Sequence, residues 1–428
     1  MKKVVAAALA VASLVTLMSC SKAGKAKEEG KVLNIYVWND EFKSRFENYY
    51  ASKLPADVTV NFIQTANQDN AYQNKLDEVL MNQSKAKADD KVDIFLVEAD
   101  YALKYVDTPY TLDVKKDIGL TDADLANQFK YTKDIMTDSK GVLKGVSWQA
   151  CPAGFAYRRS YAKQVLGTDD PAEVQKLLSD WNKFDAVAAK MKAAGYFMVS
   201  GYDDAFRVFS DNVTTKWVNG NKITIDPMIK RWIEQTKEYT DKGYNNKTSL
   251  WDGEWSKGMM ADGNVFGYFG PAWFIDFCMP HDEGSAFGDW AFCKGPQGYS
   301  WGGTWICGAA GSDNISIIKD MMLTLTCDKT TMVRIAKEAG DFTNNEPAMK
   351  EVAASDYKND FLGGQNHMAF FIDSAASIDK SFISAYDQGM NEKIQGAMKD
   401  YFNGQVTEEE AWDNFYTSVL ELYPNLSK

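Results

Sequence analysis

The sequence predicts an α/β protein of two lobes, each an open α/β sheet, followed by a largely helical C-terminal part. Three observations support this prediction. About 400 residues remain beyond an N-terminal leader, which is enough chain for two domains. Strand-like and helix-like segments alternate between residues 33 and 97 and begin to alternate again near residue 179. From about residue 319 to the end, helical periodicity dominates.

The first lobe is expected to open with a β-α-β-α-β unit. Residues 33–38 alternate and are rich in branched and aromatic side chains, which is typical of a strand, and a helix is expected from about Asp40. Residues 58–63 predict a second strand, and residues 70–83 carry apolar side chains at helical spacing. Residues 92–97 form a short apolar run of the kind buried in a parallel sheet. Open α/β sheets bind ligands at the carboxyl ends of their strands, so the loops after these three strands are candidate binding loops.

The second lobe is expected to begin after a turn at residues 141–145. Residues 146–157 are strand-like and are interrupted by Pro152, so we place a lobe boundary there. Residues 179–194 predict a helix that ends at Gly195, followed by a strand over residues 196–200.

The remaining elements complete the second lobe and return the chain to the first. A helix is expected at 227–242 and a strand at 264–269, and the strand-like pieces 290–293 and 302–309 could carry the chain back across the boundary. Further helices are expected at residues 319–326, 330–339 and 379–402, and in a last helix that Thr407 opens as its N-cap.

The N-terminus resembles a bacterial lipoprotein signal. Lys2 and Lys3 precede an uncharged apolar run, residues 4–18, that is too short to span a bilayer and closes on Ser19-Cys20. We therefore expect residues 1–20 to be a signal peptide, with Cys20 as the lipidated first residue of the mature chain. A plain cleaved signal with an incidental cysteine and an uncleaved anchor are the alternatives. Residues 21–31 lack aromatic side chains and are expected to form a flexible tether.

Composition argues against several functions. The net charge of -12 argues against nucleic acid as a partner, since its phosphates require a basic face. The chain has only two histidines, His281 and His367, and no Cys/His cluster with metal-ligand spacing, so we expect no metal site and no cofactor. Beyond Cys20 there are five cysteines, an odd number, so at least one is expected to be free or paired with another molecule.

Several segments, in their order, resemble the carbohydrate-binding extracellular solute-binding proteins of bacterial ABC importers, which share the fold of maltose-binding protein. The resemblance covers nearly all of the mature chain. It departs from the family pattern at Ser147, where the family commonly has proline, and at Cys151, where it often has a polar residue. The segments that carry it are 92–98, 145–149, 156–159, 265–273, 301–306 and 401–411.

This resemblance implies a type II periplasmic-binding-protein-like fold, in which two lobes close around a ligand. It places residues 32–145 plus about 308–350 in the N-terminal lobe, and residues 146–307 plus about 351–428 in the C-terminal lobe. The implied function is that of a lipid-anchored, extracytoplasmic receptor that captures a sugar or oligosaccharide and delivers it to the permease subunits. We expect a monomer that touches the membrane only through Cys20 and catalyses nothing.

A sugar site needs aromatic plates for the apolar sugar faces and polar side chains for the hydroxyl groups. The expected strand ends supply both kinds. For each aromatic residue the alternative is ordinary core packing, and for each acid it is a solvated turn or a helix cap. The candidate ligand-binding residues are Trp38, Asn39, Gln64, Glu98, Asp100, Tyr101, Trp148, Gln149, Cys151, Asp203, Trp273, Trp305 and Asp341.

Cys151 carries the strongest alternative function. Thiaminase I, an enzyme of this architecture, has a nucleophilic cysteine in a similar stretch, six residues after the glycine that corresponds to Gly145. A cysteine nucleophile needs a base or a lowered pKa. The thiaminase pattern also needs a glutamate at the end of the second-lobe strand, where this chain has Gly270-Pro271. A glycosidase would need two carboxylates at a fixed separation, and no motif supports one.

Overall fold

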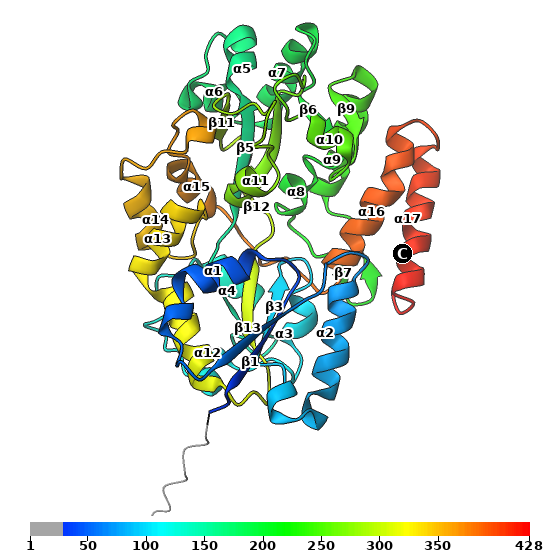
Figure 1. Cartoon of the computed structure of the whole chain (residues 1–428). Coiled ribbons are helices and arrows are strands. Elements are labelled where there is room, and N and C mark those ends of the chain that lie inside the picture. The colour runs from blue at the N-terminus through cyan, green and yellow to red at the C-terminus, as the bar shows by residue number, and fades with distance from the viewer. Residues whose placement is uncertain (1–28) are drawn as a thin grey trace, which may run out of the picture.

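The computed structural model describes residues 29–428. It has two lobes, each with its own sheet and its own hydrophobic core. Figure 1 shows the first lobe below, where the described chain begins, and the second lobe above it. The predicted fold class, a two-lobed α/β structure with helices at the C-terminus, is confirmed.

The first-lobe sheet has the strand order β2-β1-β3-β13-β4. The strands β1, β2 and β3 are parallel, as the alternating β-α-β-α-β pattern predicts, and β13 runs antiparallel between β3 and β4. The elements of this lobe are β1 (Val32–Val37), α1 (Glu41–Tyr49), β2 (Thr59–Gln64), α2 (Ala71–Asn82), β3 (Ile94–Glu98), α3 (Leu103–Val106), α4 (Lys130–Ile135), β4 (Val146–Ser147), β13 (Thr304–Gly308), α12 (Ile315–Met322) and α13 (Lys329–Ala339).

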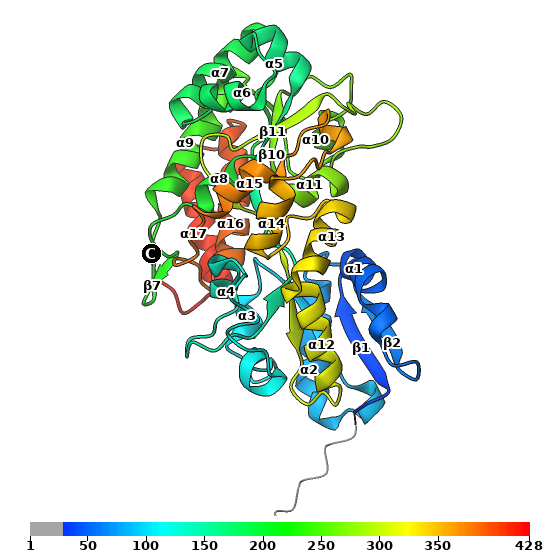
Figure 2. The same cartoon turned by 90° about the vertical axis from the view of Figure 1, so that its left-hand side faces the viewer.

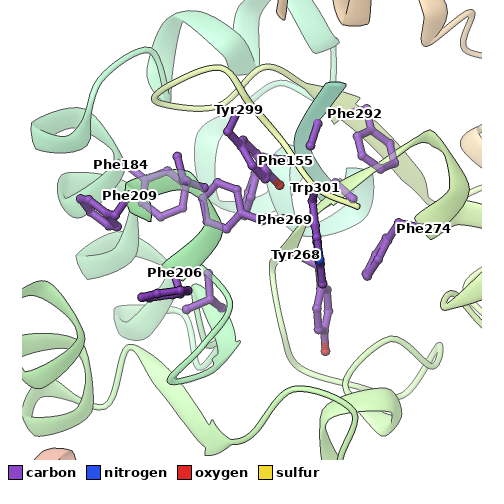
Figure 3. Packing of buried hydrophobic residues seen from close by; sticks show 14 of the residues in the cluster. Phe155, Phe184, Phe206, Phe209, Tyr268, Phe269, Phe274, Phe292, Tyr299 and Trp301 are labelled. Carbon is purple, nitrogen blue, oxygen red and sulfur yellow. The ribbon is translucent and has the colours of Figure 1, made fainter. Parts of the chain in front are cut away.

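The second-lobe sheet is built around β5, which pairs antiparallel with β10, β11 and β12. The core of this lobe is strongly aromatic, and Figure 3 shows the rings of Phe155, Phe184 and Phe269 packed together within it. The strands of this lobe are β5 (Pro152–Arg158), β6 (Val199–Gly201), β7 (Val218–Asn219), β8 (Lys222–Ile223), β9 (Asn245–Thr248), β10 (Gly267–Pro271), β11 (Trp290–Cys293) and β12 (Tyr299–Ser300). Its helices are α5 (Arg159–Leu166), α6 (Pro171–Leu177), α7 (Trp181–Ala193), α8 (Phe206–Ser210), α9 (Pro227–Lys242), α10 (Gly253–Lys257), α11 (Ala272–Phe277), α15 (Met368–Ala375), α16 (Asp387–Phe402) and α17 (Glu408–Leu422).

Short connections join the lobes. Residues 148–151 link β4 to β5, and residues 301–303 link β12 to β13. The expected lobe boundaries at 145 and 307 lie close to these two connections. Helix α14 (Glu346–Ala353) contributes to both cores, and with α13 and α15 it forms a series of helices along the side of both lobes, seen in Figures 1 and 2.

Local sequence explains where most elements begin. Pro152 is the first residue of β5, a position where its missing N–H costs no ladder hydrogen bond. Thr407 caps α17 and forms a capping box with Glu410, as the acidic first turn predicts. The helix expected at 379–402 begins only at Asp387, because serine and aspartate side chains hold the preceding segment in turns.

Candidate ligand-binding cleft

A cleft of about 490 Å³ lies between the two lobes, a volume in the range of small-molecule sites. The first lobe and the connections contribute mostly polar side chains, and the second lobe contributes mostly aromatic ones. The lining residues are Trp38, Asn39, Glu41, Asn67, Glu98, Asp100, Gln149, Arg207, Leu250, Trp251, Trp273, Phe277, Trp301, Gly302, Gly303 and Thr304.

Strand ends and helix α1 position the polar wall. Asn39 follows β1, and its side-chain oxygen accepts a hydrogen bond from the backbone N–H of Glu41, which begins α1. Glu98 is the last residue of β3, and its Oε2 accepts the N–H of Asp100 at 2.8 Å. These residues lie together because β1 and β3 are parallel neighbours and end at the same edge of the sheet.

The aromatic wall is an arc of four rings. Trp273 and Trp301 meet edge to face at 5.3 Å between centroids, and the indole N–H of Trp273 donates to the Trp301 carbonyl at 3.2 Å. Phe277 extends the arc from Trp273, and Trp251 extends it from Trp301. Trp251 and Phe277 are 56% and 68% exposed. This is unusual for such large apolar side chains and is typical of a binding surface.

Backbone strain shapes this wall. Trp251 has φ +73°, a left-handed conformation that a tryptophan rarely adopts. Gly302 and Gly303 have φ +71° and +114°, and a Cβ on Gly302 would meet the Trp273 ring at 3.3 Å. Glycine at these positions therefore permits both the turn and the close approach of Trp273.

Two carboxyl groups of the polar wall have raised pKa values. Burial, followed by the nearby charge of Asp341, raises the pKa of Glu41 to about 7. Burial, followed by the nearby charge of Asp100, raises the pKa of Glu98 to about 8. Near neutral pH these carboxyl groups can therefore donate as well as accept hydrogen bonds, which suits a hydroxylated ligand.

Asp100 and Arg207 join the lobes through an ion pair. Both terminal nitrogens of the guanidinium bind the two carboxylate oxygens, with Nη1 2.5 Å from Oδ1. Burial alone would raise the pKa of Asp100, but the charge of Arg207 holds it below its usual value. Asp100 follows β3 in the first lobe, and Arg207 lies on α8 in the second.

The structure brings six of the thirteen candidate residues together in the cleft. Four follow or end first-lobe strands, one lies in the connection after β4, and one is the second residue of α11, just after β10. These six are Trp38, Asn39, Glu98, Asp100, Gln149 and Trp273.

Three of the other candidates are aromatic residues that lie in the first-lobe core. Trp148 is fully buried against Phe42, and Tyr101 packs beside Trp38. Trp305 is 2% exposed and donates its indole N–H to the Thr132 carbonyl. These three side chains pack in the first-lobe core and do not line the cleft.

The remaining four candidates also lie outside the cleft lining. Gln64 ends β2 and is exposed. Asp341 is 2% exposed, and its carboxylate forms an ion pair with Arg45. Asp203 accepts the N–H of Leu250 at 3.3 Å, and burial raises its pKa to about 6. Cys151 is buried, and its thiol donates a hydrogen bond to the side-chain oxygen of Gln149 at 3.2 Å.

Sequence reasoning missed Glu41, Arg207, Trp251, Phe277 and Trp301 as site residues. Trp301 precedes Gly302-Gly303, a glycine pair that signals an unusual backbone and could have indicated it. Glu41 and Arg207 lie on helices, and nothing in the local pattern shows that these helices face the cleft. Asn67, in the loop after β2, lies in a candidate binding loop and lines the cleft.

The surroundings of Cys151 do not favour a nucleophile. Burial raises the pKa of its thiol well above the usual value, and the charge of Glu41 raises it further. His367 packs against Phe371, and His281 against Phe361, both within the second lobe and outside the cleft lining. Within residues 29–428, no group of three or more His, Cys, Asp or Glu side chains is placed to hold a metal ion.

The family of the chain follows from a family-model match. Residues 42–362 match the model described as bacterial extracellular solute-binding protein, which is well over half of the chain. The protein therefore belongs to this family, and the resemblance to extracellular solute-binding proteins noted in the sequence is confirmed. A comparison of the sequence with curated proteins found no match. Across the described part of the chain, the helices are all too short or too polar to cross a membrane.

Solved structures show the same fold. A protein described as extracellular solute-binding protein family 1 has a TM-score of 0.77 at 18% identity, covering 92% of this chain and 99% of that chain. The galacto-N-biose/lacto-N-biose I-binding protein of the ABC transporter from Bifidobacterium longum, solved with lacto-N-biose, has a TM-score of 0.70 at 14% identity, covering 94% and 100%. An ABC transporter associated binding protein from B. animalis subsp. lactis, solved with beta-1,6-galactobiose, has a TM-score of 0.67 at 17% identity, covering 92% and 97%.

Proposed function

We propose that this protein captures a sugar or oligosaccharide between its two lobes and delivers it to the permease of an ABC importer. The observation that carries the proposal is the division of the cleft into an aromatic wall and a polar wall. Trp251, Trp273, Phe277 and Trp301 offer ring faces and edges on one side. A sugar ring has apolar C–H faces and a rim of hydroxyl groups, so it can use both walls at once.

The polar wall fits a neutral ligand better than an anionic one. Glu41, Glu98 and Asp100 are carboxyl groups, and among residues 29–428 Arg207 is the one basic residue that lines the cleft. Both oxygens of Asp100 already bind that guanidinium. An anionic ligand would therefore meet carboxyl groups without an unpaired cation to offset them.

We also propose that the mature protein is a monomer anchored outside the cytoplasm through acyl chains on Cys20, and that it catalyses no reaction. Cys20 lies outside the described residues, and the signal in residues 1–20 supports the anchoring. The burial of the Cys151 thiol, which raises its pKa, supports a binding role over a thiaminase-like one.

A thermal-shift screen against mono- and oligosaccharides tests the proposal. A ligand present at a hundred times its Kd adds about 2.7 kcal/mol to the unfolding free energy, which is easily measured. We expect at least one neutral saccharide to raise the unfolding midpoint, and the matching uronic acid to raise it less. If thiamine raises the midpoint and no carbohydrate does, the proposal is wrong.

A further inference from the structure

The Asp100–Arg207 ion pair stands between the main cleft and a second, smaller cavity. Asp100, Arg207 and Gly302 line both spaces. The second cavity measures about 70 Å³, which holds a few water molecules and no sugar ring. The pair is therefore a partition, with the main cleft on one side and a smaller hollow on the other.

We propose that this pair is the end wall of the sugar site and sets the length of the saccharide that the cleft accepts. This inference rests on the proposed function. The terminal sugar unit is expected to abut the guanidinium and carboxylate, which bind each other at the point where the two spaces meet.

The surroundings hold the wall in place from both lobes. On the first lobe, Glu98 accepts the backbone N–H of Asp100 and fixes the turn after β3. On the second lobe, Arg207 lies on α8 between Phe206 and Val208. Both of these side chains are buried in the core and fix the helix in place. Each partner satisfies the charge of the other, and losing one would leave a partly buried charge unpaired.

The hollow behind the wall is built from side chains that suit a hydroxylated ligand. Ser210, Ser384 and Asn391 line it, together with the ion pair of Asp211 and Lys380. These groups come from α8, α16 and the turn segment before α16. Removal of the wall would therefore join the cleft to a polar extension, with room for one further sugar unit once both side chains are truncated.

Two double variants separate the bulk of the wall from its charge. Asp100→Ala with Arg207→Ala removes both side chains, whereas Asp100→Asn with Arg207→Met keeps their approximate size. Binding is measured by calorimetry on galacto-, malto- and cello-oligosaccharides from disaccharide to pentasaccharide. We expect the alanine pair to prefer a saccharide one unit longer than wild type does, with the Kd ratio between the two lengths shifted at least about tenfold. The size-conserving pair is expected to keep the wild-type preference.

Three further variants control the experiment. Ser210→Phe fills the second cavity without touching the first, so it should cancel the gain in the alanine pair and leave wild type unchanged. Asp100→Asn with Arg207→Ala, which removes the guanidinium and leaves no unpaired carboxylate, gives the same test if the alanine pair does not fold. Arg334→Ala removes an arginine from an exposed ion pair and should change no Kd.

The outcomes are distinct. An alanine pair that folds and keeps the wild-type length preference overturns the end wall while the proposed function stands. Wild-type protein that binds no saccharide overturns the proposed function, and the end wall with it.

Discussion

Arg45 and Asp341 form a bidentate ion pair behind the cleft, with Nε 2.7 Å from Oδ2 and Nη2 3.0 Å from Oδ1. The indole N–H of Trp148 donates to the same Oδ2 at 3.2 Å. Asp341 lies just after α13, so the pair joins α1 to the helices that run along both lobes. Asp341, which was expected to contact ligand, therefore uses both carboxylate oxygens in contacts that hold α1 against these helices.

Arg45→Met should destabilise the protein by about 3 kcal/mol or more, because it leaves the carboxylate of Asp341 buried without its cation. Urea unfolding followed by far-UV circular dichroism measures the change. Arg334→Met is the matched control, since it breaks an exposed ion pair with Glu338 that contributes about 1 kcal/mol or less. Equal losses in the two variants would contradict a structural role for the buried pair.

Trp273→Ala should weaken saccharide binding by about 2 kcal/mol, roughly thirtyfold in Kd, because it removes the central ring of the aromatic wall. The unfolding midpoint of the ligand-free protein should change little, since Trp273 is half-buried at the cleft surface. Trp148→Ala provides the contrast. Its side chain is fully buried, so it should cost about 3 to 5 kcal/mol of stability. A Trp273 variant that is destabilised yet binds saccharide normally would contradict this assignment.

Stability should fall as the pH rises from about 5 to 8. Glu98 has a folded pKa of about 8, above its ordinary value, so the folded state holds a proton that the unfolded chain releases across this range. The stabilisation is complete below the unfolded pKa and is lost as the pH rises through the folded one, at up to about 1.4 kcal/mol per pH unit. Glu98→Gln should reduce the slope of the profile measured by denaturant unfolding, leaving the part that Glu41 contributes. An unchanged slope in the variant would show that Glu98 is ionised in the folded protein.

Cys151→Ser should keep the fold and part of the saccharide binding, because a hydroxyl can replace the thiol in its hydrogen bond to Gln149 and the residue lies outside the cleft lining. Near neutral pH the wild-type thiol should react slowly with iodoacetamide, because burial holds its pKa high. Mass spectrometry of the Cys151 peptide measures the rate. Rapid stoichiometric alkylation, prevented by a substrate, would favour the enzyme instead.

Cys20→Ala should leave the protein exported but release it into the soluble fraction, because the acyl chains on that residue are the only membrane contact proposed. Fractionation followed by immunoblotting checks the outcome. Cys278→Ala, a substitution in the second lobe, is the control and should stay with the membrane. Membrane association that survives Cys20→Ala would indicate that the leader remains as an anchor.

The fold was largely predictable from sequence because strand and helix periodicity is a local property. The first three strands and the helices α7, α9 and α17 follow their patterns closely. The short helices α5, α6 and α8 were not predicted, since eight residues or fewer give too few turns for a periodic signal. The pairing of β13 between β3 and β4 depends on chain segments too distant for any local pattern to relate.

The site was less predictable because the direction of a side chain at a strand end depends on tertiary packing. Trp148 and Gln149 are neighbours in sequence, yet Trp148 packs in the core and Gln149 faces the cleft. Trp251 and Phe277 enter from loops and helix ends of the second lobe, where no repeating pattern marks a binding face. The rule for open α/β sheets found the polar wall, which lies at strand ends, and missed most of the aromatic one.

The position of β13 inside the first sheet has a consequence for how the protein folds. Its residue Gly308 pairs with Ile94, so strands from distant parts of the chain must meet before this sheet is complete. Contacts between such distant segments slow folding, because a long loop must close before they form. During synthesis, the first lobe cannot complete its sheet until residue 308 has emerged. The first-lobe sheet therefore remains incomplete for most of the translation of the chain.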